Sequence, residues 1–149
     1  MTTFERLVTE LGDGLGISLV PDSADVVRLY VENRLVLLHP DETRERELTV
    51  FSTVAVAPEG GFPPATLKRA LAMNLFGREV VGHHLGLFAD SLVLSASIPL
   101  ADLSAEDLAD RIVMLARLAG TLSGSFESAA PTVEAAASMS LDAGGFIAV

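Results

Sequence analysis

The chain has 149 residues, the size of one ordinary domain, and it lacks cysteine, which excludes disulfides and thiolate chemistry. Half of the residues are hydrophobic, yet Asp and Glu number 20 against 10 Lys and Arg, so the formal net charge is −10. Such a surface repels phosphate backbones and argues against nucleic-acid binding. The apolar runs are too short to span a membrane. The first residues lack the basic and apolar regions of a signal peptide, so we expect a cytoplasmic protein.

The first predicted element is an amphipathic helix near the N-terminus. Thr2 or Thr3 can cap it, and the glycines at 12, 14 and 16 are expected to end it, because glycine weakens helix interiors and closes helix C-termini. A turn at residues 21–23 follows. The apolar positions that recur at steps of three and four on one face are Phe4, Leu7, Val8, Leu11 and Leu15.

Residues 26–31, 34–39 and 48–56 are rich in β-branched and large apolar side chains and predict an antiparallel meander of three strands. The short segment Glu32–Asn33 and the charged segment 41–47 separate them. The second strand does not alternate, because residues 35–38 are all apolar. Such a strand is expected to be buried on both faces, by its own fold or by a partner.

The second half of the chain predicts helix, two strands and helix. A proline opens the middle helix and Gly77 ends it. Residues 80–88 and 92–100 form two strands around a turn at residues 89–91. Ser104 caps the last helix, whose apolar residues are Leu108, Ile112, Leu115, Ala119 and Leu122.

The predicted order is therefore α-β-β-β-α-β-β-α, an α+β fold in which helices pack on a curved antiparallel sheet. We expect a single domain over residues 1–126 and an Ala- and Ser-rich tail over residues 127–149. The apolar pair Phe146–Ile147 near the end of that tail is suited to docking into a groove of its own chain or of a neighbour.

Residues that carry chemistry are few and favour structural roles. His83 and His84 point to opposite faces of a strand, so they cannot easily share a metal ion, even with His39 as a third ligand. The carboxylates of segment 41–47 alternate with arginines, which indicates a solvated loop rather than an acid–base pair. The glycines of residues 12–16 follow a helix, whereas a phosphate loop follows a strand. No cofactor or metal is expected.

Several segments together resemble a known family. They are Leu11-Gly-Asp-Gly-Leu-Gly-Ile17, the meander, Asn74-Leu-Phe-Gly77, the stretch from Gly82 to Phe88, Ser91-Leu-Val-Leu94 and Ile98-Pro-Leu100. In this order, over residues 4–126, the chain resembles the Tir-chaperone group of class I type III secretion chaperones. The Ala- and Ser-rich tail and His83–His84 depart from that pattern.

The resemblance implies a bacterial cytoplasmic homodimer that binds the N-terminal region of a secreted effector and keeps it soluble and competent for secretion. It implies no nucleotide or covalent chemistry. In this family the middle helix and the following strand form the dimer contact, which implicates Leu67, Leu71, Leu75, Phe76, Val80 and Val81. Effector grooves over the first helix and the sheet implicate Leu7, Leu11, Leu35, Leu37 and Phe51.

Two other classes of function are compatible with the sequence. A bacterial regulatory or sensory domain can share this architecture without binding an effector. An enzyme or small-ligand binder would need polar residues inside an apolar pocket. The sequence offers His39, His83 and Tyr30 for such a pocket.

Overall fold

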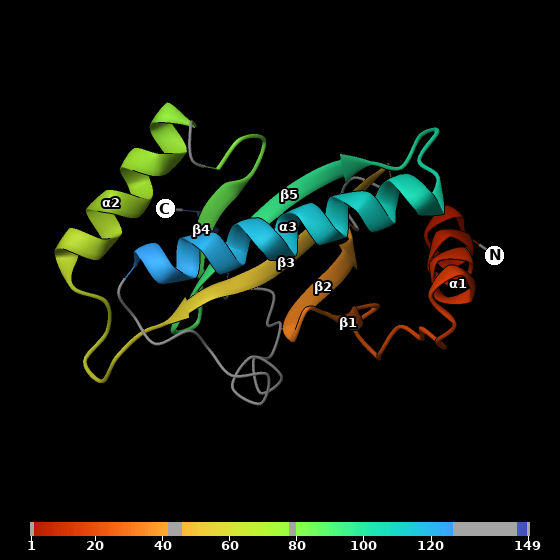
Figure 1. Cartoon of the computed structure of the whole chain (residues 1–149), viewed down its shortest axis with the longest axis horizontal. Coiled ribbons are helices and arrows are strands. Elements are labelled where there is room, and N and C mark those ends of the chain that lie inside the picture. Colours follow the sequence, from red (N-terminus) through yellow and green to blue (C-terminus); the bar gives the residue numbers. More distant parts are fainter. Residues whose placement is uncertain (1, 42–45, 78–79, 127–145, 149) are drawn as a thin grey trace.

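The computed structural model describes residues 2–41, 46–77, 80–126 and 146–148. An antiparallel sheet forms its centre, with α3 lying across one face, α1 at one end and α2 at the other (Figure 1). The predicted α+β order is confirmed, and one short strand follows it at the C-terminus. The elements are α1 (Thr3–Leu15), β1 (Val27–Val31), β2 (Arg34–Pro40), β3 (Glu47–Val56), α2 (Pro64–Phe76), β4 (His84–Phe88), β5 (Ser91–Pro99), α3 (Ala105–Ser125) and β6 (Phe146–Ala148).

The strands lie in the order β1-β2-β3-β5-β4-β6, and every neighbouring pair is antiparallel. Two tight hairpins set the register. Glu32 and Asn33 have φ angles of 51° and 64°, as a two-residue turn with the right twist requires. A hairpin also joins β4 and β5, with Phe88 opposite Ser91. After β3 the chain passes through α2 and returns with β4 and β5, and β5 pairs with β3.

The first helix differs from its prediction at its glycines. Thr2 caps α1 in a reciprocal arrangement with Glu5, and Gly16 ends the helix in the left-handed conformation at φ 69°. Gly12 and Gly14 lie inside the helix and do not end it. Gly12 is buried, and a Cβ atom there would stand 2.7 Å from the carbonyl oxygen of Ile17. The glycine therefore lets the chain fold back against its own helix.

The strand predicted at residues 80–88 begins later than expected. The segment from Val80 to His83 is a turn, closed by a hydrogen bond of 2.9 Å from the His83 amide to the Val80 carbonyl. Gly82 adopts φ 74°, a conformation that interrupts a strand. Consequently β4 begins at His84.

The main core fills the space between α3 and one face of the sheet. Alternate residues of the strands point into it, together with the inner face of α1 and the buried stripe of α3. A second buried cluster lies on the opposite face of the sheet. It comprises Val26, Leu35, Leu37 and Phe51. The second strand is thus buried on both faces, as its unbroken apolar run predicts.

Candidate functional site

The outer face of α2 exposes large apolar side chains. Leu71 and Leu75 are 51% and 78% exposed, and Val81, in the turn after the helix, is 70% exposed. Leu67 is half-buried. Val80 belongs to the core of its own chain, so its side chain is not available at the surface. The side chain of Phe76 lies outside the part of the chain that the structure describes.

Asn74 attaches α2 to the sheet. Its Nδ2 donates a hydrogen bond of 2.9 Å to the Leu85 carbonyl, and its Oδ1 accepts one of 2.7 Å from the Leu85 amide. Ala70 and Met73 occupy the inner side of the same helix and are buried. The Asn-Leu-Phe-Gly motif therefore combines a clamp onto β4 at Asn74, an exposed Leu75 and the helix end at Gly77.

The five residues predicted to bind effector are all buried in their own chain. Leu7 and Leu11 fill the main core from the inner face of α1. The others form the second cluster with Val26, on the far face of the sheet from α3; they are Leu35, Leu37 and Phe51. The structure therefore divides these residues between the two faces of the sheet and does not gather them in one groove.

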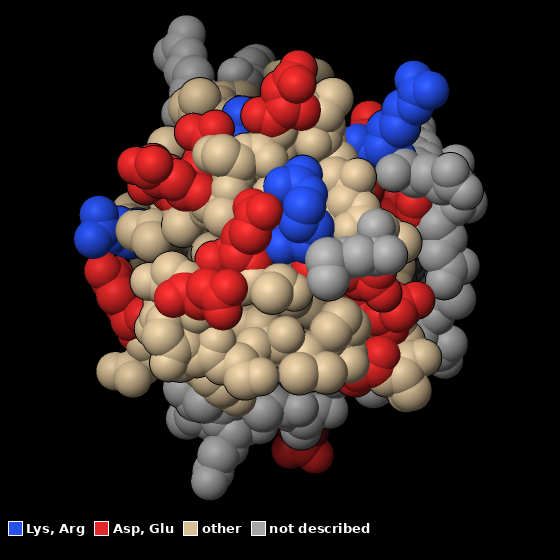
Figure 2. Space-filling model, turned by 90° about the vertical axis from the view of Figure 1, so that its right-hand side faces the viewer, with Lys and Arg blue, Asp and Glu red and all other residues tan. Residues whose placement is uncertain are grey.

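An apolar surface lies at the end of α1 and just after it, where sequence reasoning placed Leu15 on the apolar face of the helix and did not single out Ile17 or Val20. Leu15, Ile17 and Val20 are at least half exposed, with Val20 at 73%. We call these three residues the α1-end patch. The signal for it in the sequence was the segment from residue 14 to residue 21, which contains no charged residue. Figure 2 shows this end of the molecule, where acidic side chains outnumber basic ones and leave uncharged surface between them.

Asp22 fixes the chain between the α1-end patch and β1. Its Oδ1 accepts hydrogen bonds from the amides of Ala24 and Val26, at 2.8 and 3.0 Å, and its Oδ2 accepts one from Arg28. The guanidinium of Arg28, followed by the two backbone amides, lowers the pKa of the Asp22 carboxyl to about 2. The chain thus passes from the α1-end patch into β1 through a turn that hydrogen bonds and the Asp22–Arg28 ion pair hold closed.

The β1 strand is the edge of the sheet at this end. Its partner is β2, and within the described ranges no strand pairs with its other side. An edge strand presents backbone N–H and C=O groups that can accept an extended polypeptide. The α1-end patch leads directly into this edge through residues 21–26, so apolar surface and open backbone lie on one continuous segment.

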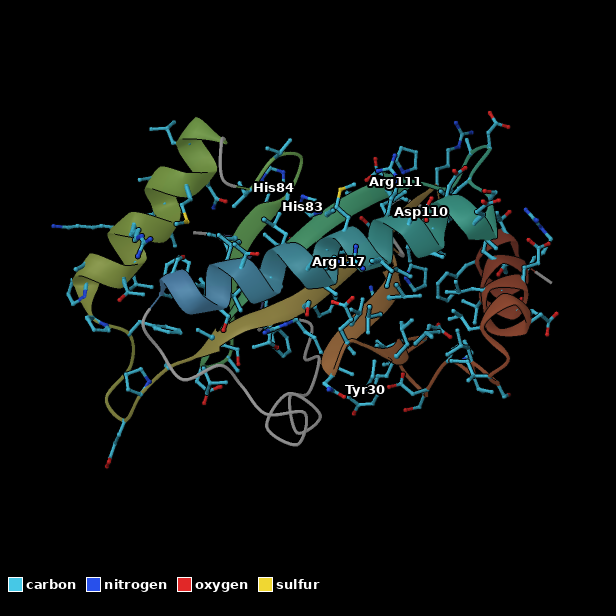
Figure 3. All side chains as sticks on the ribbon, in the orientation of Figure 1. Tyr30, His83, His84, Asp110, Arg111 and Arg117 are labelled. Carbon is cyan, nitrogen blue, oxygen red and sulfur yellow. The ribbon has the colours of Figure 1, made fainter. Side chains whose placement is uncertain are left out.

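A groove runs between β5 and the N-terminal half of α3. Its larger part has a volume of about 650 Å3, and a smaller part of about 130 Å3 reaches the turn at Val81 to His83. Met114 is 60% exposed and lines both parts. Figure 3 shows Asp110 and Arg111 on α3 beside the groove and His83 at the turn. The acidic residues lining the larger part are Asp102, Asp107 and Asp110.

The polar residues considered for a ligand pocket do not form one. Tyr30 lies on β1 at one edge of the sheet, whereas His83 precedes β4 near the other edge (Figure 3). His83 Nδ1 contacts the Val80 and Val81 carbonyl oxygens within its own turn. Among the described residues, no group of three or more His, Asp or Glu side chains could hold a metal ion. No helix in the described part is long and apolar enough to cross a membrane.

Comparison with known proteins gives one family. Residues 6–123 match the model of the Tir chaperone protein (CesT) family. No curated protein sequence matches the chain. Among solved structures, the chain is similar to the Yersinia pestis type III secretion chaperone SycH in complex with a stable fragment of YscM2. The identity is 24%, the match covers 80% of this chain and 98% of that chain, and the TM-score is 0.60.

Two further complexes contain similar chains. One is the ExsC–ExsE complex, with 19% identity, coverage of 87% of this chain and 100% of that chain, and a TM-score of 0.71. The other is the HopA1–SchA chaperone–effector complex, with 22% identity, coverage of 85% and 94%, and a TM-score of 0.63. At these identities the likeness establishes the fold, and the family match covers most of the same residues.

Proposed function

Because the chain belongs to the Tir chaperone protein (CesT) family, we propose that it is a type III secretion chaperone. In this role it binds the N-terminal region of a secreted effector and keeps that region extended, soluble and competent for secretion. The similar chains in chaperone complexes with HopA1 and with a YscM2 fragment support an effector as partner. The family is one of chaperones, so we assign binding and no catalytic step, and we place the protein in the bacterial cytoplasm.

The observation that carries this proposal is the junction of the α1-end patch with the β1 edge. An extended polypeptide can add backbone hydrogen bonds to an edge strand and place alternate side chains on neighbouring apolar surface. Leu15, Ile17 and Val20 supply that surface in a chain of strongly acidic composition. Apolar burial contributes about 25 cal/mol per Å2, most of which offsets the cost of ordering the bound segment.

We assign the exposed apolar surface of α2 and of the turn after it to a homodimer. Leu71, Leu75 and Val81 would be covered by the same surface of a second copy in a two-fold arrangement. The buried candidates keep an indirect role. Leu7 and Leu11 position α1, while Leu35 and Leu37 of β2 pack with Phe51 of β3 on the far face of the sheet.

The proposal is tested by expressing the tagged chain in its native host and identifying the proteins that co-purify. We expect a secreted protein under conditions in which secretion genes are expressed. Val20→Glu places a charge in the α1-end patch and should weaken capture by about tenfold or more, because a buried unpaired charge is costly. Met114→Glu makes the same change at an exposed position that lines the groove along α3 and should leave capture unchanged.

The comparison of the two variants shows which surface binds the effector. Loss of effector capture with Met114→Glu alone would place the binding surface in the groove along α3. Absence of any partner with the unaltered chain would contradict the chaperone proposal and favour a regulatory domain of the same architecture. Both variants must retain the melting temperature of the parent chain, since both positions are exposed.

A further inference from the structure

The outer edge of β4 is covered by two different elements. In an antiparallel strand, successive residues direct their N–H and C=O groups alternately to one side and the other. Leu85 directs both groups away from β5, and Asn74 pairs with them. By the same alternation, the backbone N–H and C=O groups of Leu87 also point away from β5, whereas those of Gly86 and Phe88 point toward β5. The described edge of β4 therefore presents two residues, Leu85 and Leu87, whose backbone groups need hydrogen-bond partners. Asn74 of α2 supplies those partners for Leu85.

The chain's own C-terminus covers the second. Strand β6 runs antiparallel to β4, with Ile147 opposite Leu87, Ala148 opposite Gly86 and Phe146 opposite Phe88. Because Leu87 faces outward, the Leu87–Ile147 pair is the one that exchanges both backbone hydrogen bonds. The amides of Phe146 and Ala148 then point away from β4. The apolar C-terminal pair was predicted to dock into a groove; in the structure it pairs with a strand edge of its own chain.

The two covers differ in how firmly the fold holds them. Asn74 belongs to a helix whose inner face is buried at Ala70 and Met73. Strand β6 has three residues and one doubly bonded pair, and residues 126–145 separate it from α3. A pairing this small is maintained because both strands belong to one chain, which makes the contact intramolecular. A longer extended segment that offers more pairs can take its place.

We propose that β6 is a displaceable internal strand that covers the outer edge of β4, and that an extended apolar segment of the effector pairs with β4 in its place. The identity of the displacing chain rests on the proposed function. An uncovered edge strand is a template for pairing with other chains, so β6 protects the free chaperone from edge-to-edge association. The effector segment offers the same chemistry as Phe-Ile-Ala, an extended apolar backbone.

Two proline variants of the full chain test whether β6 covers the β4 edge. Ile147→Pro removes the amide that donates to Leu87 and should release β6. Ala148→Pro removes an amide that points away from β4 and serves as the matched control. The probe is a fluorescent peptide with the sequence of residues 142–149, and its binding is followed by anisotropy. We expect Ile147→Pro to bind the peptide about tenfold more tightly than the unaltered chain. This is the gain expected if β6 leaves the β4 edge free in about one molecule in ten of the unaltered chain.

Ala148→Pro should match the unaltered chain in this assay. Equal affinity for all three chains, or equal gains for both variants, would overturn the internal pairing. An Ile147→Pro chain that self-associates through the open edge and ignores the peptide would show that a second copy is the occupant, which overturns the assignment to effector.

Binding of the effector to the two variants tests whether an effector segment displaces β6. The effector identified by co-purification should bind Ile147→Pro more tightly than Ala148→Pro. An effector that binds both equally uses another surface, which overturns displacement but leaves the chaperone function intact. If no effector exists, the chaperone function and the displacement both fail, while the peptide result still reports whether β6 covers the edge.

Discussion

Single residues in this fold act mainly by setting backbone contacts. Gly12 permits a close approach between α1 and the segment that follows it, and Asp22 closes the turn before β1. Asn74 joins α2 to β4 through one side chain. None of these roles is chemical catalysis. They fix the position of the α1-end patch and of the two edges of the sheet.

The two glycines inside α1 should respond oppositely to alanine. Gly12→Ala forces a Cβ atom to 2.7 Å from the Ile17 carbonyl oxygen and should destabilise the protein by about 1–3 kcal/mol. A Cβ atom added at Gly14 would meet no other atom within 4 Å, so Gly14→Ala should stabilise by up to about 1 kcal/mol through helix propensity. Urea unfolding measures both. Equal effects of the two substitutions would contradict the close approach at Gly12.

Asp22 gives the chain an acid-sensitive turn. Its folded-state pKa lies at about 2, below the ordinary value of 3.8, so its stabilisation is present above pH 3.8 and is lost as the pH falls toward 2. Asp22→Asn should therefore lower the melting temperature at neutral pH, and the difference from the unaltered chain should shrink across this window. A difference that stays constant from neutral pH to pH 2 would show that the carboxylate charge contributes nothing.

At the scale of elements, most of the fold follows from periodicity and turn residues. The pattern predicts the stripe of α3, the β1–β2 turn at Glu32–Asn33 and the helix end at Gly77 where they appear. The stripe of α1 also appears, except that Leu15 is half exposed. The late start of β4 was missed because residues 80–88 are apolar enough for a strand, and only the conformation of Gly82 interrupts them. Strand β6 is too short for any pattern to reveal its partner.

The clamp between α2 and β4 should be worth a measurable part of the stability. Asn74→Ala leaves the amide and carbonyl of buried Leu85 without their side-chain partner and should cost about 1–3 kcal/mol. Asn74→Asp keeps an acceptor for the amide and should fall between alanine and the parent. Hydrogen exchange of the Leu85 amide and urea unfolding report the loss. An unchanged exchange rate in Asn74→Ala would contradict the clamp.

At the scale of the whole molecule, residue type alone could not identify the binding surface. The apolar residues of α1 and of the sheet are equally suited to a core and to a groove, and the fold places all five effector candidates inside. For the dimer, the family resemblance implicated Leu71 and Leu75, and the structure adds that both side chains are exposed. Leu15 was assigned to the apolar stripe of α1 and is half exposed, whereas Ile17 and Val20 were missed because they follow the helix in a segment without a helical or strand pattern.

The α2 surface gives a direct test of the dimer. Leu75→Glu changes a residue that is 78% exposed in the single chain, so folding should be retained while the dimer dissociates. Val20→Glu, at another exposed apolar position, should remain dimeric. Light scattering with size-exclusion chromatography gives the mass of each variant. A dimeric Leu75→Glu chain, or a monomeric parent, would remove α2 from the interface.

The central claim is that this chain holds the N-terminal region of an effector in an extended form. The most direct measurement is limited proteolysis of the purified complex, with mass spectrometry of the protected effector fragment and of the intact assembly. We predict a protected segment near the effector's N-terminus, bound to two copies of the chaperone. Protection of a folded effector domain, or of no segment at all, would contradict the claim.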